Sequence, residues 1–198
     1  MVAGSPSLCV RSFPALETQR LVLRALAPGD EAGLLAIYAN PNVIRFCEVA
    51  RLESREQARA LLRVFQAEFE KNNGVRWAIA EKGSDQLIGL CGLGWYRHNC
   101  SALLGYDLNQ DYWNRGIMTE AVRAVVSYAF EQGINRVTAT TVKENPASVR
   151  VLQHVGFQEE GILRDWGHWR GKFVDLRCFS LLRAEWNVGF AARPSSGN

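Results

Sequence analysis

Alternation of apolar and polar residues at every second position predicts strands in several short stretches of the chain. In the stretch 18–24, Leu21 and Leu23 share one face, while the flanking arginines Arg20 and Arg24 share the other. Short apolar or β-branched runs predict further strands at 77–81, 87–93, 102–108, 136–142, 157–166 and 172–182. Segments that favour strands are therefore spread over almost the whole chain.

A longer period, near four residues, predicts helices between these strands. After Gly116 the apolar residues recur at 117, 121, 125 and 129, and Gly133 suits the position just past a helix end. A capping box at Ser54 and Gln57 opens another helix, which stops near 73–74, and shorter helices are predicted at 34–40 and 145–155. Because helices and strands mix throughout, we expect a single α/β or α+β domain.

Composition agrees with one packed domain and excludes several other classes of protein. The chain has 198 residues, against a usual domain length of about 150. Its 47% hydrophobic and 22% charged residues are ordinary for a globular protein, which excludes disordered, collagen-like and disulfide-stapled chains. Six tryptophans require a substantial core or a binding cleft. The net charge of +3 gives no reason to expect direct nucleic-acid binding.

The cysteines and the termini favour a reducing compartment, with neither metal nor membrane. The five cysteines form no CxxC pair and have no zinc-ligand spacing to a histidine, so we expect buried or incidental thiols and no metal. No secretory signal is visible at the start, and no apolar run approaches the roughly 18 residues that a membrane helix needs. The expectation is a cytoplasmic protein that does not bind membranes.

Two predicted helix starts carry candidate binding chemistry. Gly116 follows a strand and opens a helix, so the first-turn N–H groups, the helix dipole and Arg115 could bind an anion. A plain strand–turn–helix connection is the alternative. Asn145 and Pro146 form an ordinary N-cap and first-turn pair. On this interpretation, Asn145 and Ser148 only satisfy the polar groups of the helix start. No helix follows the glycine-rich run 89–94, so a dinucleotide site is not expected there.

Together, these two helix starts resemble the cofactor half of the GCN5-related N-acetyltransferase (GNAT) superfamily. The superfamily's pyrophosphate motif, Gln/Arg-x-x-Gly-x-Gly/Ala, aligns with Trp113, Gly116 and Met118, of which only Gly116 fits. The run 116–121 resembles instead the variant in ribosomal-protein N-terminal acetyltransferases. Further features typical of that subgroup are Thr18-x-Arg20-Leu21-x-Leu23-Arg24, Asn145-Pro-x-Ser148, Val155-Gly156-Phe157, the run 160–164, and Gly171 with Asp175 before 179–181.

The resemblance implies a domain over residues 16–186, with an N-terminal extension at 1–15 and a flexible C-terminal tail at 187–198. It implies a mixed, mostly antiparallel, V-shaped sheet flanked by helices, which splays between its fourth and fifth strands to admit acetyl-CoA. The cofactor contacts that it implies come from the strand end at Leu108, from Asn145, and from the turn and helix start Asn114, Arg115, Gly116, Ile117, Met118 and Thr119.

The resemblance also implies direct transfer, in which a neutral amine attacks the thioester, an oxyanion forms beside the Leu108 amide, and the CoA thiolate leaves. Many members of the superfamily have a tyrosine as proton donor where this chain has Leu152, and the subgroup uses the serine that corresponds to Ser148 instead. Ser148 is therefore the candidate proton donor. The alternative, that Ser148 serves only the helix start, stays open. Leu103 stands where a strand glutamate often acts as base. Asp107 shares that strand face and is the candidate base; the alternatives are Glu48, His98 and His168.

The acceptor side is less defined in the sequence. Glu48 and Asp175 could bind an acceptor ammonium, and His168 and Trp169 lie in a hairpin expected beside the acceptor entrance. An α-amino group, with a pKa of about 7.7–8.0, is partly neutral near pH 7. The missing glutamate therefore favours a protein N-terminus, such as that of a ribosomal protein, over lysine. A small amine (polyamine, amino acid or antibiotic) or a non-catalytic CoA-binding module are the alternatives, and both monomer and homodimer stay open.

Overall fold

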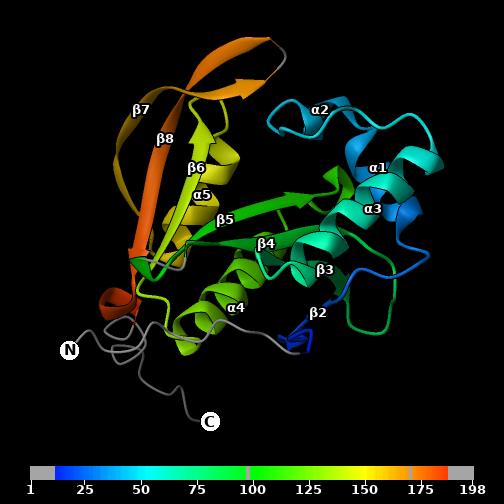
Figure 1. The fold of residues 1–198 in the computed structure, drawn as a ribbon, viewed down its shortest axis with the longest axis horizontal. Helices are drawn as coiled ribbons and strands as arrows, with labels where there is room; N and C mark the ends of the chain where they lie inside the picture. Colours follow the sequence, from blue (N-terminus) through cyan, green and yellow to red (C-terminus); the bar gives the residue numbers. More distant parts are fainter. Residues whose placement is uncertain (1–11, 97–98, 170, 187–198) are drawn as a thin grey trace.

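The fold is an eight-stranded sheet with helices against both faces (Figure 1). Its mixed, mostly antiparallel order is the one that the family resemblance implies, with one strand more than the seven that the sequence pattern predicts. The computed structural model describes residues 12–96, 99–169 and 171–186. Strands follow the order β1-β2-β3-β4-β5-β6-β8-β7 across the sheet. They span β1 Leu16–Glu17, β2 Leu21–Arg24, β3 Gly74–Glu81, β4 Gly89–Tyr96, β5 Ser101–Leu108, β6 Arg136–Val142, β7 Gln158–Trp169 and β8 Lys172–Leu182.

The helices lie in two groups along the chain. The first group is α1 Glu31–Tyr38, α2 Pro41–Ile44 and α3 Arg55–Glu70, and the second is α4 Ile117–Glu131 and α5 Pro146–Val155; a short 3₁₀ turn, η2, spans Gln110–Tyr112. Side chains that alternate along a strand point to opposite faces of the sheet. Helices α1–α3 pack against one of these faces, and helices α4 and α5 pack against the other. Leu34, Tyr38 and Phe65 form one core with Leu90 of β4. Trp77 anchors the other core, its ring centroid 5.4 Å from that of Tyr128 on α4.

The sheet opens between β5 and β6, the one parallel pair among the described strands and the fourth and fifth of the strands that the sequence predicts; this opening positions the site. All other neighbouring strands are antiparallel. Strands β5 and β6 pair only from Ser101 and Arg136 to Leu104 and Ala139. Beyond that point β5 continues to Leu108 and β6 to Val142 without pairing. Figure 1 shows the consequence: β6, β7 and β8 rise steeply from the plane of β3, β4 and β5.

Local sequence signals explain most element boundaries, and the exceptions depend on tertiary contacts. Ser54 Oγ accepts the Gln57 amide as a helix cap should, although the Gln57 side chain returns to the amide of Glu53 rather than to that of Ser54. Helix α2 and strand β1 are too short to give a periodic signal and were not predicted. Strand β7 extends past the predicted 166 because its pairing with β8 continues to Trp169 and Lys172, and it contains two register shifts, Glu159/Gly161 and Leu163/Gly167.

The second of these irregularities is stabilised from the neighbouring strand. Asp165 has a positive φ of 50°, which is uncommon for a residue other than glycine. Its backbone N–H donates to Asp175 Oδ1 on β8 at 2.9 Å. Asp175, a residue expected to bind an acceptor ammonium, therefore has a structural contact that shapes the β7–β8 hairpin.

The described residues contain no disulfide, no cluster of metal ligands and no helix that could cross a membrane. No disulfide joins the described cysteines, of which Cys91 is buried and Cys47, Cys100 and Cys178 are half-buried. Within the described ranges, no three or more His, Cys, Asp or Glu side chains gather as metal ligands would. No helix in these ranges combines the length and the apolar character needed to cross a bilayer.

Candidate active site

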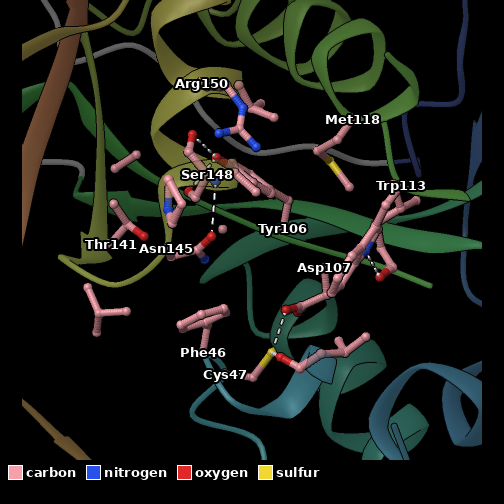
Figure 2. Close-up of a pocket in the computed structure, with 18 of the residues that line it drawn as sticks. Phe46, Cys47, Tyr106, Asp107, Trp113, Met118, Thr141, Asn145, Ser148 and Arg150 are labelled. Atoms are coloured by element: carbon pink, nitrogen blue, oxygen red, sulfur yellow. Dashed lines mark hydrogen bonds between the residues drawn. The ribbon is translucent and has the colours of Figure 1, made fainter. Parts of the chain in front are cut away.

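A cavity of about 720 Å³ occupies the opening between β5 and β6. Its walls come from the ends of both strands, from the starts of α4 and α5, from Leu176 of β8, and from the segment that follows α2. Figure 2 shows Tyr106 and Ser148 on one side of this cavity, and Cys47 and Asp107 on the other. Residues from these six parts of the fold therefore meet around one space.

The turn before α4 presents backbone amides to the cavity. Asn114 and Gly116 both have positive φ, 59° and 72°, a conformation that glycine adopts without the cost it imposes on other residues. The first hydrogen bond within α4 runs from Glu120 N to Gly116 O at 3.1 Å. The amides of the first turn precede that bond and are suited to an anion. Residues from this turn that line the cavity are Asn114, Gly116, Ile117, Met118 and Thr119.

Arg115 lies outside the cavity lining, although the sequence suggested it as an anion ligand. Its guanidinium carbon stands 5.2 Å from the centroid of the Tyr112 ring. Another positive side chain, Arg150 on α5, does line the cavity (Figure 2). The tertiary structure thus supplies the cavity with a cation that the motif alone does not identify.

Glu120 ties the glycine turn to the start of the sheet. Its carboxylate accepts hydrogen bonds from Thr18 Oγ1 at 2.6 Å and from the Arg20 amide and Nε at 2.9 and 2.7 Å. Arg20 Nη1 also donates to the Arg115 carbonyl at 3.0 Å. Burial alone would raise the pKa of Glu120, but these hydrogen bonds and the Arg20 charge outweigh it and lower that pKa. The segment 18–24 and the run 116–121, each typical of the resembled subgroup, are thereby in direct contact.

The end of β5 directs a backbone amide toward the opening. Asn109 N donates to Ile88 O of the adjoining antiparallel pair at 2.9 Å. Because such bonds alternate along the ladder, the N–H and C=O of Leu108 point away from β4, toward the separated β6. The Leu108 carbonyl accepts from Trp113 Nε1 at 2.9 Å, which leaves the amide as the polar group available to a ligand. Trp113, a departure from the motif, thus braces the strand end.

Ser148 is fixed at the start of α5. Its backbone N–H donates to the N-cap Asn145 Oδ1 at 3.1 Å, the helix-start role that the sequence left open. Its hydroxyl also lies 2.8 Å from the hydroxyl of Tyr106 on β5, and both side chains line the cavity (Figure 2). The helix-start role and exposure to the cavity therefore coexist in one residue.

Asp107 lies on the other face of β5, as strand alternation requires. Its two carboxylate oxygens accept from Tyr38 Oη at 2.8 Å and from Cys47 Sγ at 2.9 Å. Burial, together with the negative charge of Asp107, raises the pKa of Tyr38 well above its ordinary value, so the phenol keeps its proton and donates. Asp107 is therefore a carboxylate at the cavity wall, held in place by two donors.

The other predicted acceptor and base residues are distributed unevenly. Glu48 lines the cavity beside Cys47. Leu103 shares the strand face of Asp107 but lies outside the lining, with 37% of its surface exposed. His168 also lies outside it and packs against Phe173, with ring centroids 4.6 Å apart. His98 and the Trp169 side chain lie outside the described residues.

Sequence reasoning gave no place at the site to Tyr38, Cys47, Tyr106 and Arg150, and it named Arg20 only within the opening motif. The residues Tyr38, Cys47, Tyr106 and Arg20 approach their partners across 69, 60, 42 and 100 positions of the chain. No local spacing pairs such positions. The sole available signal was adjacency, because Tyr106 precedes the candidate base Asp107 on a predicted strand.

A parallel strand pair that separates beside a glycine-started helix is the arrangement that the resemblance implies for an acyltransferase that binds acetyl-CoA. Comparisons with known proteins agree. The family model described as "Acetyltransferase (GNAT) domain" matches residues 20–158. "Uncharacterized N-acetyltransferase YoaA" of Bacillus subtilis is 34% identical over 86% of this chain and 98% of its own. The chain belongs to the GNAT acetyltransferase family and is an N-acetyltransferase.

Two more distant relatives are named for a particular reaction. "[Ribosomal protein uS5]-alanine N-acetyltransferase" of Escherichia coli is 27% identical, covering 88% of this chain and 93% of its own. The solved structure of RimL, a ribosomal L7/L12 alpha-N-protein acetyltransferase in complex with coenzyme A, has a TM-score of 0.77. It is 18% identical and covers 85% of this chain and 98% of its own, which shows a common fold. The predicted superfamily and fold are confirmed.

Proposed function

We propose that this enzyme transfers the acetyl group of acetyl-CoA to the α-amino group of a protein N-terminus. The observation that carries the proposal is the pair of walls around the cavity: hydroxyl groups and the helix-start amides on one side, and the fixed Asp107 carboxylate on the other. The similarity to a ribosomal-protein alanine N-acetyltransferase supports this class of acceptor.

The residues of the cavity fit acetyl-CoA. Asn114 and the amides of Gly116, Ile117, Met118 and Thr119 would hold its pyrophosphate, since the positive φ of Gly116 lets the backbone approach closely. The separated ends of β5 and β6 leave backbone groups for the pantetheine, and Asn145 lies beside them. We assign Arg115 a role in the shape of this turn, because its side chain lies over Tyr112.

When bound, acetyl-CoA supplies a thioester whose carbonyl a neutral amine attacks, with departure of the thiolate. The Leu108 N–H, directed into the opening, stabilises the developing negative charge on oxygen. Ser148 gives its hydroxyl proton to the departing sulfur and recovers a proton from solvent. Asp107 takes the proton that the amine loses and returns it to solvent.

The cavity wall that contains Asp107 and Glu48 suits an acceptor amine that is cationic in solution but whose pKa is low. Asp107 and Glu48 attract an ammonium group as it enters the cavity. An α-amino group, with a pKa of about 7.7–8.0, then supplies a neutral fraction near pH 7, whereas a lysine at about 10.4 supplies far less. The contact between Asp175 and the Asp165 amide favours a part in hairpin shape for Asp175 rather than in direct binding.

An assay for released CoA tests the proposal. The enzyme is given acetyl-CoA with a panel of peptides that have free N-termini, and separately with polyamines, amino acids and aminoglycosides. Release with peptides, abolished by blocking their N-termini, is the expected result. CoA release with small amines alone would show that the acceptor is a small amine rather than a protein N-terminus. Tight acetyl-CoA binding without any CoA release would show that the protein is a non-catalytic CoA-binding module.

A further inference from the structure

We infer that Tyr106 is a positioning residue for acetyl transfer, which holds the Ser148 hydroxyl with its hydrogen directed into the cavity. The inference rests on the proposed role of Ser148 as proton donor. It adds a residue that no motif and no comparison assigns to the reaction.

The contacts between the two residues leave Ser148 little freedom. The Tyr106 hydroxyl lies 2.8 Å from Ser148 Oγ and 3.3 Å from the Ser148 carbonyl oxygen. The Ser148 amide is meanwhile bound to Asn145 Oδ1 at 3.1 Å. Tyr106 comes from β5 and Ser148 from α5, so the pair also spans the strand and the helix on this side of the cavity (Figure 2).

Either hydroxyl can donate in the hydrogen bond between Tyr106 and Ser148, and in the inferred arrangement the phenol donates to Ser148 Oγ. Burial raises the pKa of Tyr106, and the hydrogen bond to Ser148 only partly offsets that rise. Tyr106 therefore keeps its proton at neutral pH and can donate it as a hydrogen bond. When Ser148 Oγ accepts from the phenol, its own hydrogen is available to a second acceptor. In the reaction, that acceptor is the departing sulfur.

In this arrangement the proton that the departing sulfur takes comes from Ser148, and the Tyr106 O–H bond stays intact. The C–S bond of the thioester breaks, the C–N bond forms, and the sulfur takes the Ser148 hydrogen, which solvent replaces. Leu152, where a tyrosine acid would project from α5, is fully buried in the core instead. The tyrosine in this cavity wall is instead Tyr106 of β5, and its hydroxyl contacts Ser148.

A double-mutant cycle tests the inference. Tyr106→Phe, Ser148→Ala and the combined variant are compared in kcat, in KM for acetyl-CoA and in direct acetyl-CoA affinity, with a peptide acceptor. Loss of one orienting hydrogen bond is expected to lower kcat about 10-fold for Tyr106→Phe, with acetyl-CoA affinity changed less than about twofold. In the Ser148→Ala background the same substitution should have no further effect, because Tyr106 acts through that serine.

Controls separate this role from general destabilisation. Tyr128→Phe removes a hydroxyl from a largely buried tyrosine that packs against Trp77, outside the cavity lining, and should leave kcat unchanged. If Tyr106→Phe does not fold, Tyr106→Met fills similar space without a hydroxyl and should give the same kcat loss. Unchanged kcat in the folded variant, or equal losses in both Ser148 backgrounds, would overturn the inference. A wild-type enzyme inactive with every peptide would instead refute the proposed function itself.

Discussion

The guanidinium Nε of Arg20 lies 2.7 Å from a carboxylate oxygen of Glu120, across 100 positions of the chain. This ion pair fastens the first turn of α4 to the segment that leads into β2. The same arginine donates to the Arg115 carbonyl inside the glycine turn. The turn that we propose to hold the donor's pyrophosphate therefore depends on a residue far outside its own motif.

The Glu120 contacts predict a dependence of stability on pH. The pKa of Glu120 is lower in the folded protein than its ordinary value of 4.5, so its contribution is complete above that value. The contribution is lost as pH falls through the lower, folded-state pKa. Melting temperatures should be higher for wild type than for Glu120→Gln at pH 7, and should converge once the pH falls below the folded-state pKa of Glu120. Glu70→Gln, at the exposed end of α3, should show no such difference; parallel curves for wild type and Glu120→Gln would contradict the prediction.

Gly116→Val should abolish measurable acetyl-CoA binding. The φ of 72° costs a residue with a side chain about 1–2 kcal/mol, and a β-branched residue the most. A β-carbon would meet only Arg20 Nη2, at 3.5 Å, so the backbone conformation is what fails rather than the available space. Isothermal titration calorimetry would measure the loss.

Gly83→Val provides the matched control for this substitution. Gly83 has a φ of 84° with nothing within 4 Å of its β-carbon position, and it lies outside the cavity lining. It should lower stability by a similar amount and leave acetyl-CoA affinity intact. Equal affinity losses in the two variants would show that the effect is general strain.

Asp107→Asn should lower kcat/KM for a peptide acceptor by about 100-fold at pH 7, the scale on which a positioned base acts. The loss should shrink as pH rises through 8, because solution chemistry then supplies the neutral amine without the carboxylate. A pH–rate profile from pH 6 to 9 measures both effects. Asp111→Asn on η2 is the control, and a loss independent of pH would argue against a base.

Trp113→Phe should weaken acetyl-CoA binding by about 3–10-fold while preserving the fold. The substitution removes the indole N–H that donates to the Leu108 carbonyl, and a lost hydrogen bond has an effect of about 1 kcal/mol. The strand end then loses the contact that keeps the Leu108 amide aligned with the opening. Trp166→Phe, in which a 69% exposed indole is replaced on β7, is the comparison variant. An unchanged affinity for Trp113→Phe would remove this bracing role.

The sequence predicted the glycine turn and the Asn145 cap because both depend on neighbouring residues. Gly116 and Asn145 occupy their conformations through local sterics and a hydrogen bond across three residues. Arg115 shows the limit of such reasoning. It is next to the turn in sequence, yet its guanidinium lies over the Tyr112 ring and the residue is not part of the cavity lining.

By itself, the sequence determined the order of the longer elements, the buried face of the stretch 18–24 and the resemblance to the family. Those features are encoded in periodicity and in motifs of adjacent residues. Only the tertiary structure decided which groups face one another in the cavity. The Tyr106–Ser148, Tyr38–Asp107 and Cys47–Asp107 contacts each arise where β5 separates from β6 and meets helices from distant parts of the chain. Such contacts depend on the packing of whole elements, which no local spacing of residues specifies.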